Sequence, residues 1–203
     1  MADVSAQQVM ALRKKTGAGI VACKKALIEF EGDEEKAIEH LRVKGLASAD
    51  KKSSRAADEG IVYSYIHTGD RLGVMIELRC ETDFVARTDD FRQLAKDLSM
   101  QVAAMHPVAI DETGFAEEVI EAERRVYTEQ ALESGKPQNI AEKIVEGKLK
   151  KFMKERALLD QTYIKNQPEE KNRTVREYLQ QNISKLGENI QVARFARFEL
   201  GSE

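Results

Sequence analysis

Residues 72–91 read LGVMIELRCETDFVARTDDF, and the hydrophobic period of this stretch changes half-way along it. The first half alternates between two faces, which predicts a half-buried strand that ends at Cys80. From Thr88 the apolar residues follow helical spacing, so we expect a helix over 89–105 with Thr88 as its N-cap. The apolar residues are Leu72, Val74, Ile76, Leu78 and Cys80 in the strand, and Phe91, Leu94, Ala95, Leu98, Val102 and Met105 in the helix.

Phe84 lies between these two elements, where neither the strand face nor the helix face accounts for it. On residue type alone, an aromatic packed in the core under a tight turn is the commoner outcome. The alternative is an exposed aromatic presented to a partner. The local pattern leaves both interpretations open.

The composition of the chain limits the classes of protein to consider. It has 203 residues, with 42% hydrophobic and 33% charged, which is typical of a soluble and helix-rich globular protein. A net charge of -3 argues against a dedicated nucleic-acid coat. We find no apolar run of membrane-spanning length and no signal-peptide pattern at the N-terminus. Cys23 and Cys80 lie in separate segments, so we expect free thiols in a reducing compartment.

Residues 1–45 are expected to form three short helices that pack as a small bundle, since none would be stable alone. Ser5 and Gln8 have capping-box spacing at the start of the first helix, and Asp33 is the expected cap of the third, which we expect to stop at Gly45. The expected buried residues of this module are Val9, Leu12, Ile20, Cys23, Ala26, Leu27, Phe30, Ala37, Ile38 and Leu41.

Residues 46–60 are rich in Ala, Ser and Lys, and they predict a basic linker or an exposed helical extension. Lys51, Lys52 and Arg55 lie close together in this segment. A solvated basic face is favoured over a phosphate-binding one.

The remaining residues, 61–203, predict an α+β core. Strands at 61–67 and 71–80 are joined by a turn, and the last strand covers 190–200. Its alternation is imperfect, which indicates a bulge or an edge position. Together the three strands predict an antiparallel sheet.

A helical hairpin is expected at about 115–155, inserted between these strands. Its two helices, 115–133 and 138–155, are connected by Ser134-Gly135-Lys136-Pro137, so they must be antiparallel neighbours. Because much of their surface is charged, we expect the hairpin to protrude.

No set of residues predicts catalysis, a metal site or a cofactor. His40, His67 and His106 are scattered, without a partner at a spacing typical of zinc or of a nucleophilic dyad. Residues 17–22 fit the dinucleotide pattern G-x-G-x-x-A, but a helix precedes them where that motif requires a strand. We therefore expect no enzyme and no direct nucleotide binding.

Several motifs in order along the chain resemble the bacterial translation elongation factor Ts family. They cover nearly the whole chain, so together they are far more specific than any single motif. The matching segments are Leu12-Arg13, Thr16-Gly17-Ala18-Gly19, Cys23-Lys24-Lys25-Ala26-Leu27, Gly32-Asp33, Lys44-Gly45, residues 80–86, Gly135-Lys136-Pro137, residues 140–147 and residues 187–190.

The resemblance implies a guanine-nucleotide exchange factor for elongation factor Tu. It implies a module like a ubiquitin-associated domain at 1–45 that contacts the GTPase, a linker at 46–60 and an α+β core with the hairpin at 61–203. In the family, the aromatic of the Thr-Asp-Phe segment wedges between helices near the switch region of the GTPase. The residues that the resemblance assigns to partner binding are Thr82, Asp83, Phe84, Val85, Arg13, Ile20 and Val21.

Two departures from the family pattern carry consequences. Ala22 stands where many relatives have an acidic residue, which puts the role of that acid in doubt. Longer relatives repeat the core, whereas this chain has room for one copy, so we expect two chains to pair through their sheets in a 2:2 complex with elongation factor Tu. The expected location is the bacterial cytoplasm, or an organelle of bacterial descent. A helical adaptor or RNA-associated protein remains the alternative function.

Overall fold

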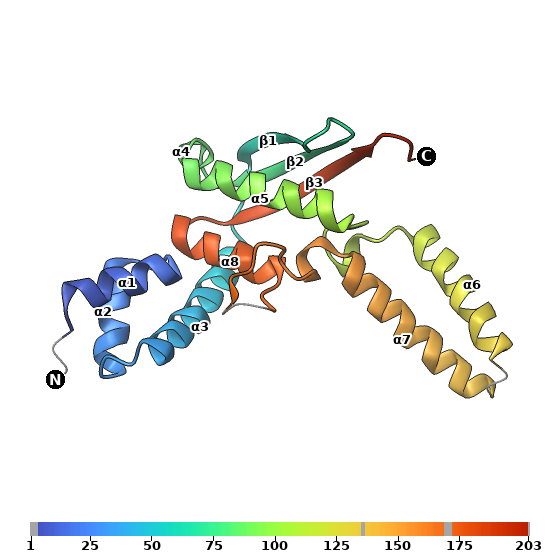
Figure 1. Ribbon diagram of the computed structural model, residues 1–203, viewed down its shortest axis with the longest axis horizontal. Helices are drawn as coiled ribbons and strands as arrows, with labels where there is room; N and C mark the ends of the chain where they lie inside the picture. Colours follow the sequence, from blue (N-terminus) through green and yellow to red (C-terminus); the bar gives the residue numbers. More distant parts are fainter. Residues whose placement is uncertain (1–3, 135–136, 169–171, 203) are drawn as a thin grey trace. The chain divides into compact units, whose positions relative to one another are not determined.

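The computed structural model describes residues 4–134, 137–168 and 172–202. These residues form an α+β fold in which three helices precede a three-stranded antiparallel sheet, so the predicted fold class is confirmed (Figure 1). The elements are α1 (Ala6–Thr16), α2 (Ile20–Glu29), α3 (Glu34–Lys52), β1 (Glu59–Ile66), β2 (Leu72–Cys80), α4 (Asp83–Ala86), α5 (Asp89–Met105), the 3-10 helix η1 (Glu112–Gly114), α6 (Glu117–Glu133), α7 (Gln138–Arg156), the 3-10 helix η2 (Leu158–Asp160), α8 (Val175–Leu186) and β3 (Ile190–Glu199). The chain divides into two compact units, one of residues 1–63, 76–97 and 177–193 and one of residues 64–75, 98–176 and 194–203.

Helices α1, α2 and α3 pack around a small hydrophobic core of their own. The predicted capping box is present, with Gln8 N donating to Ser5 Oγ at 3.2 Å and Ser5 N donating to Gln8 Oε1 at 3.0 Å. Ile20, expected in this core, is instead 49% exposed, because it is the first residue of α2 and lies outside the packed cluster. The core residues are Val9, Leu12, Cys23, Ala26, Leu27, Ala37 and Leu41.

Helix α3 does not stop at Gly45 as expected but continues to Lys52. A glycine within a helix costs about 1 kcal/mol relative to alanine, so contacts with α8 must offset it. A Cβ atom on Gly45 would lie 3.6 Å from Ser184 Oγ, and Gln180 Nε2 donates to Asp50 Oδ1 at 3.1 Å. Ala49 is buried as well. Tertiary packing therefore overrides the local stop signal.

The sheet has the order β1-β2-β3, which places β2 in the centre and β3 at an edge, as its imperfect alternation predicts. The predicted face of β2 is buried, except that Leu72 is only half-buried. Gly60 in β1 has φ +149°, and a Cβ atom there would lie 2.2 Å from the carbonyl oxygen of Leu78 in β2. Only glycine allows the two backbones to approach so closely.

Helix α5 has the predicted bounds, and Phe91 N donates to Thr88 Oγ1 at 3.3 Å, as expected of an N-cap. Its apolar stripe is buried apart from Met105, which is 42% exposed because it is the last residue of the helix. His106 follows with φ 45°, which lies outside the right-handed helical region, so the helix ends before Pro107.

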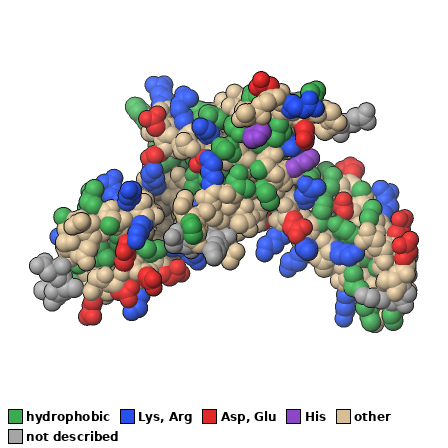
Figure 2. Space-filling view, in the orientation of Figure 1, with side chains coloured by type: hydrophobic (Ala, Val, Ile, Leu, Met, Phe, Trp, Pro, Cys, Tyr) green, Lys and Arg blue, Asp and Glu red, His purple; other side chains and the backbone are tan. Residues whose placement is uncertain are grey.

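Helices α6 and α7 form the predicted antiparallel hairpin (Figure 1). Between them lies a narrow apolar seam of Ala131, Ala141, Val145 and Leu149. On the face shown in Figure 2, the hairpin carries charged side chains of both signs together with hydrophobic ones. Within the connection predicted at 134–137, Gly135 and Lys136 lie outside the described residues.

Candidate partner-binding site

Phe84 is the most exposed large hydrophobic side chain among the described residues, at 79%. It is the second residue of α4, a helix of four residues between the end of β2 and the start of α5. The interpretation of Phe84 as a core aromatic is therefore wrong. The side chain is presented to solvent at a strand-to-helix junction.

Helix α4 is too short to be stable alone, and its ends are held by specific contacts. Thr82 is its N-cap, with Val85 N donating to Thr82 Oγ1 at 3.4 Å. At the other end, Thr88 Oγ1 donates to the carbonyl oxygen of Val85 at 2.8 Å. On the outer side, Arg87 forms an ion pair with Asp83 at 2.8 Å, while Ala86 is buried beneath. The backbone that carries Phe84 is thus fixed on both sides of the aromatic.

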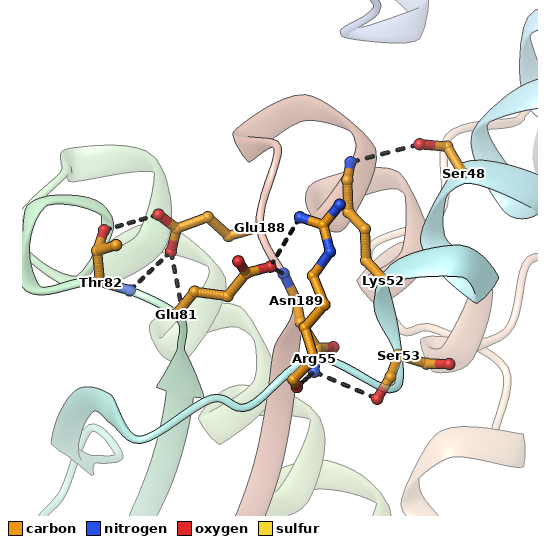
Figure 3. Close-up of polar contacts among 8 residues, drawn as sticks. All are labelled: Ser48, Lys52, Ser53, Arg55, Glu81, Thr82, Glu188 and Asn189. Carbon is orange, nitrogen blue, oxygen red and sulfur yellow. Dashed lines mark hydrogen bonds and ion pairs between the residues drawn. The ribbon is translucent and has the colours of Figure 1, made fainter.

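Glu188, in the middle of the loop between α8 and β3, binds the backbone immediately before α4 (Figure 3). Its Oε2 accepts from Glu81 N at 3.1 Å and from Thr82 N at 3.0 Å, and its Oε1 accepts from Thr82 Oγ1 at 2.6 Å. The last of these distances is typical of a hydroxyl bound to a carboxylate. One carboxylate therefore satisfies three donors of the turn.

The contact is reciprocal, because Glu81 holds the backbone of Asn189. Glu81 Oε1 accepts from Asn189 N at 2.7 Å and from Arg55 Nη1 at 3.4 Å. The buried side chain of Asn189 donates through Nδ2 to the carbonyl oxygens of Arg55, at 2.7 Å, and Ser53, at 3.3 Å. We call Glu81, Thr82, Glu188 and Asn189 the clamp.

Cys80, the last residue of β2, contributes a further contact beneath the turn. Its Sγ donates to the carbonyl oxygen of Thr82 at 3.1 Å. Burial, together with the nearby carboxylate of Glu188, raises the pKa of the Cys80 thiol to about 11. The thiol is therefore protonated at neutral pH and can act as a donor. Both cysteines are buried and free.

Arg13, Ile20 and Val21 flank the turn between α1 and α2. Arg13 lines an open hollow of about 830 Å³, and Val21, 68% exposed, lines a neighbouring one of about 410 Å³. Gly17, with φ 68°, allows the turn by adopting the left-handed conformation that favours glycine. Ile20, 49% exposed, and Val21 thus present two apolar side chains beside this turn, and the exposed Arg13 presents a cation.

Lys185 of α8 lies between the turn that joins α1 to α2 and the start of α5. Lys185 Nζ forms an ion pair with Asp90 at 2.7 Å, and its Cδ lies 3.7 Å from the position that a Cβ atom on Gly17 would take. Both charged residues also line the hollow beside Arg13. The structure thus connects the turn between α1 and α2 with the segment that follows α4.

The described residues show neither a metal site nor a membrane-spanning helix. Within residues 4–134, 137–168 and 172–202, no group of three or more His, Cys, Asp or Glu side chains could hold a metal ion. His67 bonds to the hydroxyl of Tyr65 at 2.8 Å, whereas His40 lies against Phe30, with ring centroids 5.0 Å apart. In the same part of the chain, no helix combines the length and the apolar character needed to cross a bilayer.

Comparison with known proteins identifies the family. The family described as Elongation factor TS matches residues 35–170. The elongation factor Ts of Oleidesulfovibrio alaskensis is 54% identical over 202 residues, which covers 100% of both chains. That of Syntrophomonas wolfei is 51% identical over 98% of this chain and 91% of its own, and that of Desulfosudis oleivorans is 50% identical over 99% and 100%. These matches place the chain among the proteins of translation elongation. It belongs to the elongation factor Ts family.

The clamp could not be predicted from the sequence, although its residues lie in segments that carried the resemblance. Residues 80–86 and 187–190 were both recognised, but nothing in either segment shows that they meet. Thr82 and Glu188 are 106 residues apart. The local signal was a pair of acidic residues, Glu81 directly after β2 and Glu188 two residues before β3, and acidic residues are common at turns.

Proposed function

We propose that this chain is a guanine-nucleotide exchange factor that binds elongation factor Tu and promotes the release of GDP. The observation that carries the proposal is Phe84, a large aromatic side chain that is 79% exposed on a backbone fixed at both ends. Such an aromatic buries a large area on binding and loses little rotamer entropy. We further propose that the protein works in the cytoplasm of a bacterium, or in an organelle of bacterial descent.

An exchange factor needs differential binding and no reacting groups. Accelerating GDP release by about 10³ to 10⁴ requires that the barrier fall by roughly 4–5.5 kcal/mol. One aromatic anchor at the centre of an interface supplies about 2 kcal/mol or more. Arg13, Ile20 and Val21 form a second contact with elongation factor Tu. This contact supplies part of the barrier lowering that Phe84 does not provide. The coupling is reciprocal, so bound nucleotide weakens the complex by the same factor.

The test is the release of a fluorescent GDP analogue from elongation factor Tu, with and without this protein. Phe84→Ala removes the anchor from an exposed position, so we expect release about 30-fold slower than with the wild type and an unchanged unfolding midpoint. Met105→Ala, which truncates another exposed apolar residue, is the matched control and is expected to behave as wild type. If the Phe84→Ala variant accelerates the release of GDP from elongation factor Tu as much as the wild type does, Phe84 is not the wedge.

The alternative, an RNA-associated protein, would use Lys51, Lys52 and Arg55. Two of these three make contacts within the chain: Lys52 Nζ donates to Ser48 Oγ at 3.3 Å, and Arg55 binds Glu81. Because Lys52 and Arg55 already bind partners within the chain, they are less available to bind phosphate groups, which favours the exchange function over RNA binding. RNA binding would weaken steeply with added salt and would depend on these basic residues, whereas exchange depends on Phe84.

We also propose that two chains pair through their sheets and bind two partners. The support is a group of exposed apolar side chains on the strands and at their ends: Ile66 (60%), Met75 (49%), Phe198 (68%) and Leu200 (64%). These residues line a common hollow of about 500 Å³. Light scattering should give the mass of a dimer, and Phe198→Glu should give that of a monomer. A wild-type monomer with full activity at every concentration would refute pairing.

A further inference from the structure

The turn that carries Phe84 depends on a side chain from the far end of the chain. The backbone N–H groups of Glu81 and Thr82 both donate to Glu188. These groups precede α4 and so have no partner within that helix. Glu188 is thus the acceptor that satisfies them.

Glu188 also fixes the direction of the cap. The Thr82 hydroxyl donates its one proton to Glu188 Oε1 at 2.6 Å, which leaves an oxygen lone pair to accept from Val85 N. Without that carboxylate the hydroxyl can rotate, and the cap of α4 is no longer specified. The chain of contacts runs from Glu188 through Thr82 to the backbone on both sides of Phe84.

We propose that Glu188 is a positioning residue for exchange: without serving as the wedge itself, it holds Phe84 in the orientation in which the partner can bind it. This inference rests on the proposed function. Preorganising a contact residue removes an ordering cost that binding would otherwise have to offset. Loss of the carboxylate should therefore reduce exchange through Phe84 and by no other route.

The same clamp holds the chain that leaves α3. Asn189, next to Glu188, binds the carbonyl oxygens of Ser53 and Arg55, and Arg55 in turn binds Glu81 (Figure 3). The segment after the three-helix module and the turn before α4 are therefore held at one place. This arrangement explains why a buried asparagine follows the glutamate.

The experiment is a double-mutant cycle on release of the fluorescent GDP analogue, using Glu188→Ala, Phe84→Ala and the double variant. Glu188→Ala should slow release about 10-fold. In the Phe84→Ala background it should add no more than about 2-fold, because its effect passes through that side chain. Glu188→Gln, whose amide oxygen can still accept both N–H groups, should slow release by only about 3-fold.

Asp111→Ala is the matched control for stability. The Asp111 carboxylate also accepts from a backbone N–H, Thr113 N at 2.9 Å, and from a hydroxyl, Thr113 Oγ1 at 2.6 Å, but in another loop. The Asp111→Ala variant should lower the unfolding midpoint about as much as Glu188→Ala does, and it should leave exchange at the wild-type rate.

Two results would overturn the inference. One is that Glu188→Ala promotes GDP release at the wild-type rate. The other is that Glu188→Ala slows release by the same factor in the wild-type protein and in the Phe84→Ala variant. If Glu188→Ala does not fold, Glu188→Gln is used in the same cycle with the same criteria. A wild-type protein that does not accelerate the release of GDP from elongation factor Tu would instead refute the proposed function.

Discussion

Replacing Gly60 by alanine should destabilise the protein strongly without touching the candidate site. The new Cβ atom would lie 2.2 Å from the carbonyl oxygen of Leu78 and 2.8 Å from the Cα atom of Arg79. Both are backbone atoms of β2, so β1 must move away by about 1 Å, which lengthens ladder hydrogen bonds worth about 1 kcal/mol each. A left-handed φ adds about 1–3 kcal/mol of strain. The sum is about 3 kcal/mol or more.

For a chain of this size, that loss lowers Tm by about 6–12 °C, measured by circular dichroism at 222 nm. Gly147→Ala is the control, because Gly147 is exposed in the middle of α7 with no described atom within 4 Å of its added Cβ. Removing a helical glycine should raise stability by about 0.5–1 kcal/mol. A Tm for Gly60→Ala within 1 °C of wild type would refute the close approach of β1 to β2.

Two further predictions concern Val21 and Cys80. Val21 is 68% exposed, so Val21→Ser should leave Tm unchanged. It should raise by about 3-fold the concentration of this protein needed for half-maximal GDP release. A titration with an unchanged midpoint would exclude Val21 from the contact with elongation factor Tu. Because the pKa of the Cys80 thiol is raised from 9.0 to about 11, the folded state keeps a proton that the unfolded state loses, so stability is lost as pH rises through this window. Wild type should therefore lose about 2 kcal/mol more than Cys80→Ala between pH 9 and 11, and parallel denaturant midpoints for the two proteins would contradict this.

Local patterns predicted the elements well where neighbouring residues decide the structure. The bounds of α5 follow from a threonine cap, a helical stripe and a proline, all of which act within a few residues. The capping box of Ser5 and Gln8 is local in the same sense. The buried face of β2 was predictable because a strand alternates with period 2 whatever it packs against.

Features that depend on distant residues were not predictable from the pattern. Gly45 looked like a helix stop because its contact with Ser184 is invisible in the local sequence. The exposure of Phe84 depends on whether a neighbouring element covers it, and residue type alone favoured the core. Ile20 fitted a buried stripe by spacing, but the three-helix core includes Cys23 in the first turn of α2 and not Ile20.

The clamp also bears on when the protein matures during its own synthesis. Thr82 leaves the ribosome 106 residues ahead of Glu188, and β2 lacks its neighbour β3 until Ile190–Glu199 have been made. Until then the turn of α4 has no carboxylate to bind and one edge of the central strand is open. A nascent chain that ends before residue 188 cannot form these contacts, so the turn that carries Phe84 is fixed only after Glu188 has been made.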